Sequence, residues 1–236
     1  MRYEAIALDY DGTLAKDGKV DADTIAGLEQ VKASGRRLLM VTGRELDSLY
    51  ATFDRVDLFD LVVAENGGLL YRPADRKLMP LAHAPTPAFV SELSARGVKP
   101  ISVGAVIVAT WEPHEATVLG TIRDLGLELE VIFNKGAVMV LPSGVNKGTG
   151  LKAALKELGL SPAAVVGVGD AENDHSFLNL CGASAAVANA LPALKARADI
   201  VTSRDHGAGV VEVITHVLAN DLVDVVRAPQ PGAPIG

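Results

Sequence analysis

Short apolar runs alternate with amphipathic stretches along most of the chain. Runs of this kind are typical of strands that are buried on both faces of a parallel sheet. The stretches between them carry apolar residues at helical spacing, and two of them end at Gly35 and Gly159, the residue type that most often closes a helix. This alternation predicts an α/β fold built on a doubly wound parallel sheet. The predicted elements are strands at 4–8, 37–41, 61–64, 164–168, 185–187 and 200–201, and helices at 22–34, 45–53, 148–158, 173–181, 191–197 and 208–219.

The rhythm of the pattern changes between residues 84 and 143. Each helical stretch is followed there by two strand-like runs, and this order occurs twice. Such an order lacks parallel crossovers and suits an antiparallel sheet with helices on one side. We therefore predict a small inserted α+β domain. Its predicted elements are helices at 86–96 and 112–125 and strands at 101–103, 106–108, 127–133 and 137–141.

The two patterns divide the chain into four segments. Residues 1–83 and 144–227 form the two parts of a core domain, and residues 84–143 form the inserted domain. Residues 71–83 are polar and carry two prolines, so we expect a loop there. The tail, residues 228–236, is rich in proline and glycine and is expected to be disordered.

Composition and charge exclude several classes of function. The chain has 236 residues and a formal net charge of −7, which argues against a nucleic-acid partner or an anionic membrane surface. No apolar run reaches the length of a membrane span, and the first predicted strand begins too early to leave room for a signal peptide. A single cysteine, Cys181, allows no intramolecular disulfide. We therefore expect a cytoplasmic protein, either a monomer or a homodimer.

Polar side chains follow the predicted core strands at the point where each strand ends. Asp9 and Asp11 come directly after the first strand, and the alternation of side chains along an extended chain places them on the same side. Thr42, Asn66 and Asp170 follow three other strands. Since the carboxyl ends of parallel strands meet at one edge of a sheet, where ligands bind, we expect these groups to converge. Two carboxylates at such an edge favour a divalent cation and acid–base chemistry.

Two residues at predicted helix starts are suited to binding an anion. Thr42 precedes Gly43, and a hydroxyl with free backbone N–H groups at a helix start can bind a phosphate, although an N-cap threonine with a glycine turn is the favoured explanation of the pair taken alone. Lys147 begins another predicted helix, where a positive charge is unfavourable with the helix dipole. That position is tolerable if the ammonium faces an anion, so we predict that Lys147 binds one.

A second acidic group lies in the run Gly169-Asp170-Ala171-Glu172-Asn173-Asp174. Mg²⁺ prefers a few hard oxygen ligands and keeps several waters, so two or three carboxylates and a carbonyl are enough to hold it. Asp170, at a strand end, would bind the ion directly, and Asp174, one turn later, would bind it directly or through water. A helix N-cap explains a single aspartate in this run but not the whole group.

Four motifs of the chain resemble those of the haloacid dehalogenase (HAD) superfamily, which includes aspartate-dependent phosphatases. In chain order they are Asp9-Tyr10-Asp11-Gly12-Thr13, Val41-Thr42-Gly43-Arg44, the run 142–148 that contains Lys147, and the run 169–174. Their spacing resembles the branch whose cap domain is inserted between the second and third motifs, as in Cof-type, phosphoglycolate phosphatase-like and sucrose-phosphatase-like proteins. The resemblance covers all but the tail, and it implies a Rossmann-like core with a cap at 84–143.

The resemblance also implies a reaction and a role for each motif residue. The expected reaction is Mg²⁺-dependent hydrolysis of a small phosphomonoester, either a sugar phosphate or phosphoglycolate, through an aspartyl-phosphate intermediate. Asp9 would be the nucleophile, and Asp11 would be the general acid and base. The residues expected to hold the transferring group or the substrate are Thr42, Gly43, Lys147 and Asn173. Thr42 and Lys147 are also expected to act in catalysis. The residues expected to hold the metal are Asp9, Asp11, Asp170 and Asp174.

Two other functions stay open at this point. A sugar phosphomutase shares the fold and the cap position, although its cap is usually longer. A non-catalytic protein that binds a phosphorylated metabolite is also compatible with the fold, but the presence of both Asp9 and Asp11 argues against it. The sequence does not indicate which cap residues choose the leaving group, or whether that choice is narrow or broad.

Overall fold

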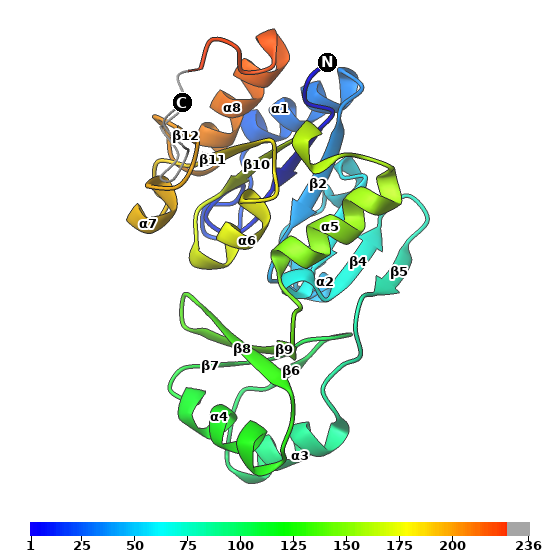
Figure 1. Cartoon of the computed structure of the whole chain (residues 1–236), viewed down its shortest axis with the longest axis vertical. Coiled ribbons are helices and arrows are strands. Elements are labelled where there is room, and N and C mark those ends of the chain that lie inside the picture. Colours follow the sequence, from blue (N-terminus) through cyan, green and yellow to red (C-terminus); the bar gives the residue numbers. More distant parts are fainter. Residues whose placement is uncertain (226–236) are drawn as a thin grey trace, which may run out of the picture.

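The computed structural model describes residues 1–225, and the predicted disordered tail at 228–236 lies outside the described residues. The chain forms two lobes (Figure 1). The larger lobe is built around an eight-stranded sheet and the smaller one around a four-stranded sheet, and we call them the core and the cap. The chain leaves the core after β5 (Lys77–Pro80) and returns to it after β9 (Ala137–Pro142), while the residues that bound the two domains stay a prediction.

The remaining elements of the core come from both ends of the chain. The strands are β1 (Ala5–Leu8), β2 (Arg37–Val41), β3 (Leu61–Ala64), β4 (Leu69–Arg72), β10 (Val165–Gly169), β11 (Ala183–Ala186) and β12 (Ile200–Val201). The helices are α1 (Ala22–Ala33), α2 (Leu46–Thr52), α5 (Lys147–Leu158), α6 (His175–Leu178), α7 (Pro192–Lys195) and α8 (His206–Asn220). Within residues 1–225, no helix combines the length and hydrophobicity needed to span a membrane.

The core sheet has the strand order β12-β11-β10-β1-β2-β3-β4-β5, and all neighbours from β12 to β3 are parallel. Helices cover both faces: α1 packs against α8, and α5 packs against α6 on the opposite face (Figure 1). A strand covered on both faces must be apolar throughout, and β1, in the middle of the sheet, is buried along its whole length. The predicted doubly wound α/β fold is confirmed.

The register of β1, β2 and β10 determines which residues lie at the edge of the sheet where polar groups were expected. Leu8 of β1 pairs with Val168 of β10 on one side and with Met40 of β2 on the other. The three strands therefore end level with one another, and the residues that follow them emerge at the same edge. Asp9, which comes directly after Leu8, lies at the middle of that edge.

Residues 71–83 do not form the predicted loop. β4 and β5 form an antiparallel hairpin that extends the sheet, with Leu69 opposite Pro80 and Arg72 opposite Lys77. β5 is largely exposed, and its lysine and its terminal proline are residues that protect an edge strand from further pairing. β5 is only four residues long, and its two apolar residues stand between a lysine and a proline, so the run is too short to show the alternation that predicts a strand.

The cap sheet has the order β6-β7-β9-β8, and every pair is antiparallel. Its helices α3 and α4 lie on the side that faces away from the core (Figure 1). They bury Phe89, Leu93 and Val118 against the sheet. The predicted α+β insert with helices on one side is confirmed. Its elements other than β9 are α3 (Pro87–Ala95), β6 (Ser102–Val103), β7 (Val108–Trp111), α4 (Glu115–Asp124) and β8 (Leu129–Asn134).

Two predicted elements are displaced by side chains that bind the backbone. The strand expected at 106–108 begins only at Val108, because the backbone N–H groups just before it donate to the carboxylate of Glu65. The helix expected at 173–181 is a 3₁₀ turn followed by the single turn of α6. The carboxylate of Asp174 accepts the N–H groups of Asp170 and Ala171, at 2.8 and 2.9 Å, and this tight loop replaces the first helical turn.

Candidate active site

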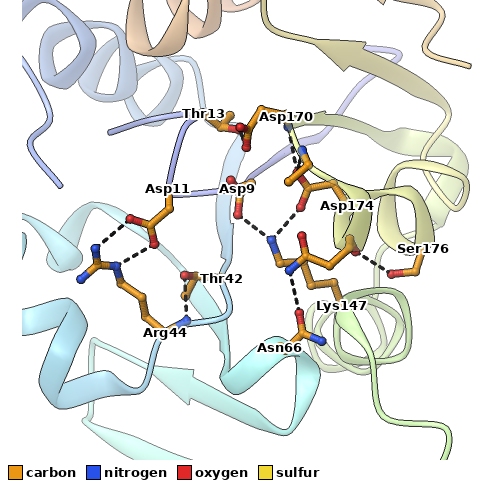
Figure 2. Close-up of polar contacts among 12 residues, drawn as sticks. Asp9, Asp11, Thr13, Thr42, Arg44, Asn66, Lys147, Asp170, Asp174 and Ser176 are labelled. Atoms are coloured by element: carbon orange, nitrogen blue, oxygen red, sulfur yellow. Dashed lines mark hydrogen bonds and ion pairs between the residues drawn. The ribbon is translucent and has the colours of Figure 1, made fainter. Parts of the chain in front are cut away.

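Asp9 follows the central strand and lies in contact with a buried lysine. Its carboxylate accepts a hydrogen bond of 2.6 Å from Nζ of Lys147 (Figure 2). The same ammonium donates to Oδ1 of Asp174, also at 2.6 Å. Lys147 is the first residue of α5 and is only 1% exposed. The charge that is unfavourable at a helix N-terminus is therefore placed between two buried carboxylates.

The three buried charges perturb one another. Burial lowers the pKa of Lys147, but the carboxylates of Asp174 and Asp9 outweigh burial and raise that pKa above its ordinary value, so the side chain is an ammonium. Burial and repulsion by Asp174 raise the pKa of Asp9 well above its ordinary value, against the attraction of Lys147. A carboxylate that is this costly to ionise favours the binding of a further cation beside it.

The start of α5 packs closely against neighbouring backbone, and this packing places Lys147 at the edge of the sheet. Asn146 caps the helix through its side chain. A Cβ atom on Gly148 would lie 2.4 Å from the carbonyl oxygen of Ser176, and a Cβ atom on Gly67 would lie 2.0 Å from the carbonyl oxygen of Asn146. The absence of side chains at these two glycines lets the helix start come close enough for Lys147 to reach Asp9.

Asp9, Asp170 and Asp174 form a buried acidic cluster whose carboxylate oxygens lie within 4.8 Å of one another. Together with the ammonium of Lys147, the three carboxylates carry a formal charge of −2, which a divalent cation would neutralise. All three donors are hard oxygens, the ligands that Mg²⁺ and Ca²⁺ prefer. The residues at this place therefore fit a divalent cation.

A cation from the cap also reaches this cluster. Lys135 lies at the tip of the hairpin formed by β8 and β9. Its Nζ donates to Oδ2 of Asp170 and to the backbone oxygen of Asp11, both at 2.9 Å. Unlike Lys147, this side chain is 49% exposed. Lys135 is thus a direct link between the cap and the acidic cluster of the core.

The carboxylate of Asp11 has a different partner from the other acidic groups. Arg44 binds it through two parallel hydrogen bonds, from Nε to Oδ2 at 2.7 Å and from Nη2 to Oδ1 at 2.8 Å. The carboxylate points toward Arg44, away from Asp170 and Asp174 (Figure 2). The bidentate pair fixes its orientation, and with the side chain 36% exposed the carboxylate stays open to solvent. Asp11 therefore offers the cluster its backbone oxygen, while its side chain lies outside the cluster, paired with Arg44 at the cavity wall.

The other predicted residues lie around this contact network. Thr42 is buried at the end of β2, and its hydroxyl accepts the backbone N–H of Arg44 at 3.1 Å. Asn173 donates from Nδ2 to Oδ1 of Asn66 at 2.9 Å. Neither Thr42 nor Asn173 lines the cavity described below, whereas Gly43 does. The structure thus brings Asp9, Lys147 and the two aspartates of the fourth motif into one cluster, with Thr42 and Asn173 outside it.

A cavity of about 650 Å³ opens at this edge between the core and the cap. Its core wall consists of Asp9, Asp11, Gly43, Arg44, Glu45, Ser48 and Lys147. The cap wall is mostly apolar and consists of Pro100, Ile101, Ser102, Ile107, Ala109, Thr110, Trp111, Asn134, Lys135, Ala137 and Met139. A pocket with charged groups on one wall and apolar groups on the other fits a small molecule that carries an anionic group at one end.

Three residues of the site have no role predicted from the sequence. Arg44 belongs to the second motif, but nothing in the sequence indicates that its side chain pairs with the carboxylate of Asp11. Lys135 and the glycine after it are a turn signal between two predicted strands, and that signal marks a hairpin tip without showing what the tip contacts. Glu65 follows β3, and its carboxylate binds backbone N–H groups of the cap at 105–107.

Known proteins match the chain over nearly its whole length. A family model described as haloacid dehalogenase-like hydrolase matches residues 6–99 and 121–214. A phosphoglycolate phosphatase from Methanothermobacter thermautotrophicus is 32% identical over 216 residues, which cover 89% of this chain and 96% of that protein.

Solved structures share the fold. A haloacid dehalogenase-like hydrolase from Bacteroides thetaiotaomicron superimposes with a TM-score of 0.76 at 18% identity, covering 91% of this chain and 99% of that one. A sugar phosphatase of HAD subclass IIB superimposes with a TM-score of 0.73 at 20% identity, covering 90% of this chain and 98% of that one. The chain therefore belongs to the haloacid dehalogenase-like hydrolase family, as its four motifs predicted.

Proposed function

We propose that this chain is a Mg²⁺-dependent phosphatase that hydrolyses small phosphomonoesters through an aspartyl-phosphate on Asp9. The observation that carries the proposal is the position of Asp9. Its carboxylate lines the cavity, is bound by the buried ammonium of Lys147, and belongs to a cluster that fits a divalent cation. The relatives named as phosphatases support the same reaction.

In the first step an oxygen of Asp9 attacks the phosphorus, and the bond between phosphorus and the ester oxygen breaks. The leaving alkoxide takes a proton from Asp11, whose carboxyl group lines the same cavity. A carboxylate is a weak nucleophile toward an anionic ester, so the negative charge of the phosphoryl group must be offset. Lys147 offsets part of it, and the backbone N–H of Gly43, a residue that lines the cavity, adds a hydrogen bond to a phosphoryl oxygen.

In the second step water attacks the phosphorus of the aspartyl-phosphate. Asp11, now ionised, accepts a proton from that water, and the bond between phosphorus and Asp9 breaks. Inorganic phosphate leaves, and both carboxyl groups return to their starting state. Arg44 serves this step because its two hydrogen bonds hold the Asp11 carboxylate in one orientation.

The proposed metal is Mg²⁺, held by the carboxylates of Asp9 and Asp170, with Asp174 as a direct or water-mediated ligand and with the backbone oxygen of Asp11. Bound there, the ion supplies a positive charge close to the phosphoryl oxygens and lowers the charge repulsion between ester and nucleophile. Asp174 also binds Lys147 and the backbone of its own loop, so it positions the other charged groups.

The cap would choose the leaving group. The cavity of about 650 Å³ has room for leaving groups from a two-carbon acid to a sugar. The curated relative is named for phosphoglycolate, so we propose phosphoglycolate and similar small phosphomonoesters as the substrates to examine first. The predicted cytoplasmic location and the choice between monomer and homodimer remain predictions.

The test is phosphate release from a panel of phosphomonoesters, with Mg²⁺ and with EDTA. The panel contains phosphoglycolate, hexose phosphates, sucrose 6-phosphate, nucleotides and nitrophenyl phosphate. We expect release that depends on Mg²⁺ and that falls below detection in Asp9→Asn. The exposed Asp54, changed to asparagine, provides a control with the same loss of charge and should leave the rate unchanged. Release that persists in Asp9→Asn would exclude Asp9 as the nucleophile.

A further inference from the structure

Lys135 is the first residue of the turn that joins β8 and β9. Asn134 and Ala137 pair across the end of the hairpin, so Lys135 and Gly136 alone form the turn. Both turn residues have positive φ, 49° and 85°, as a tight two-residue hairpin turn requires. This turn matches the twist of the two strands, and it presents the Lys135 side chain from a fixed tip.

The core leaves an opening for this side chain. A Cβ atom on Gly12 would lie 2.6 Å from Nζ of Lys135 and 2.3 Å from Oδ2 of Asp170. Any other residue at Gly12 would therefore displace the contact between the cap lysine and the core aspartate. The ammonium reaches its two acceptors, Oδ2 of Asp170 and the backbone oxygen of Asp11, through this opening.

The two acceptors are oxygens that the proposed metal would use. A divalent cation bound at about 2 Å from these oxygens and an ammonium hydrogen-bonded to the same oxygens would be separated by a few ångströms at most, and their charges repel. The ammonium of Lys135 and the divalent cation therefore compete for these two oxygens. Binding of the ion weakens the contact between Lys135 and the core.

The cavity is where the displaced ammonium can go. Lys135 lines the cavity, and it is the one charged residue among those that the cap contributes to the wall. Its neighbours on that wall, such as Ile107, Trp111 and Met139, carry no charge. On the core wall, Asp11 is already paired with Arg44, and Glu45 is the other carboxylate that lines the cavity outside the acidic cluster. An anionic group on the leaving part of the substrate would give the ammonium a partner within the cavity itself.

We propose that Lys135 is an exchangeable cation that selects an anionic leaving group. In the absence of metal its ammonium neutralises Asp170 and holds the hairpin tip on the core. When the divalent cation binds, the ammonium moves into the cavity and binds a carboxylate carried by the leaving group. This inference rests on the proposed function, and it names the substrate class as phosphomonoesters whose leaving group carries a carboxylate.

The first experiment measures Mg²⁺ binding by isothermal titration calorimetry without substrate. Lys135→Gln removes the competing ammonium, so the ion no longer has to break the ion pair between Lys135 and Asp170. A half-exposed ion pair of this kind stabilises by about 1 kcal/mol, and we therefore expect Mg²⁺ to bind about five-fold more tightly than to the wild type. Lys135→Asn, which suits a positive φ, should give the same result and guards against a misfolded turn. Arg123→Gln removes one charge from an exposed cap side chain and should stay within two-fold of the wild type. Equal or weaker binding by both Lys135 variants would overturn the exchange.

The second experiment compares two esters that differ only in the charge of the leaving group, phosphoglycolate and 2-hydroxyethyl phosphate. Lys135→Gln should raise KM for phosphoglycolate about ten-fold, as for loss of a charge-assisted hydrogen bond, and change KM for the neutral ester less than two-fold. Arg123→Gln should change neither KM. A KM that shifts equally for both esters, or for neither, would overturn the selection.

The two experiments separate this inference from the proposed function. A wild-type chain that binds Mg²⁺ but hydrolyses no ester would contradict the proposed function, and the calorimetric comparison would still decide whether Lys135 and the ion compete. A wild-type chain that binds no divalent cation would overturn both. Hydrolysis of phosphoglycolate with unchanged KM in Lys135→Gln would overturn the role of Lys135 alone.

Discussion

Replacing Lys147 with methionine should destabilise the protein strongly, because it leaves two buried carboxylates without their shared cation. Methionine has nearly the same length as lysine, so the packing of α5 is kept while the charge is lost. Lys147 is 1% exposed, and both of its acceptors, Asp9 and Asp174, lie at 2.6 Å. Removing one partner of a buried ion pair costs about 3–5 kcal/mol of unfolding free energy. For a chain of this size that corresponds to a fall in Tm of about 10 °C.

The loss should depend on pH in a definite direction. Without the ammonium, the buried Asp9 carboxyl has an even higher pKa than in the wild type, where burial already raises it. A carboxyl whose pKa is raised in the folded state binds its proton more tightly when folded, so it stabilises the fold at low pH. That stabilisation disappears as the pH rises through the raised pKa. The Tm difference between wild type and Lys147→Met should therefore be larger at pH 8 than at pH 5.5.

The assay is thermal unfolding followed by circular dichroism, in EDTA, at both pH values. Lys152→Met is the matched control, because Lys152 is exposed on the same helix and should change Tm by less than 2 °C. Added Mg²⁺ should restore part of the loss in Lys147→Met, since the ion also neutralises the cluster. A Tm for Lys147→Met that equals that of the control at both pH values would refute the buried ion network.

Three further changes test other parts of the structure. Glu65→Gln should lower the unfolding free energy by about 2–3 kcal/mol and speed proteolysis between core and cap, because the Glu65 carboxylate accepts three backbone N–H groups of 105–107. Gly67→Ala should prevent folding at 37 °C, seen as loss of soluble protein, since its φ is +104° and Asn146 leaves no room for Cβ. Asp221→Asn should lower the free energy of unfolding, measured with urea at pH 7, by about 1 kcal/mol. The effect is small because the ion pair of Asp221 with Arg36 is partly exposed to solvent. The hydrogen bonds to Asp221, first that of the Arg2 N–H, lower its pKa to about 2, so this difference should shrink as the pH falls from 4 toward 2.

The centre of the site was predictable because parallel strands end together. Asp9 and Asp170 each follow a short apolar run, and those runs are neighbours in the sheet. Lys147 stood out because a lysine at a helix start needs an anion, and two buried carboxylates surround it. In each case the deciding information is local: the end of a strand or the first residue of a helix.

What the sequence did not reveal depends on how distant segments meet. The contact between Lys135 and Asp170 depends on the position of the cap over the core, which no local pattern determines. The start of β7 is set by Glu65, which lies more than 40 residues earlier in the sequence. Its carboxylate accepts the N–H groups of Val106 and Ile107, which therefore do not pair in the sheet. The edge strand β5 was missed for another reason, since its four residues are too few to show an alternating pattern and end in a proline.

The most direct test of the central claim is to trap the phosphorylated enzyme. The variant Asp11→Asn with nitrophenyl phosphate is suited to it, because this leaving group needs no proton and the water that attacks the intermediate has lost its base. The reaction is stopped with acid and digested, and the peptides are examined by mass spectrometry. We predict that one phosphoryl group accumulates on the peptide that contains Asp9, and that it is absent when Asp9 is also changed to asparagine. Release of nitrophenol in several turnovers with no phosphoryl group on that peptide, or with one on another residue, would contradict the account.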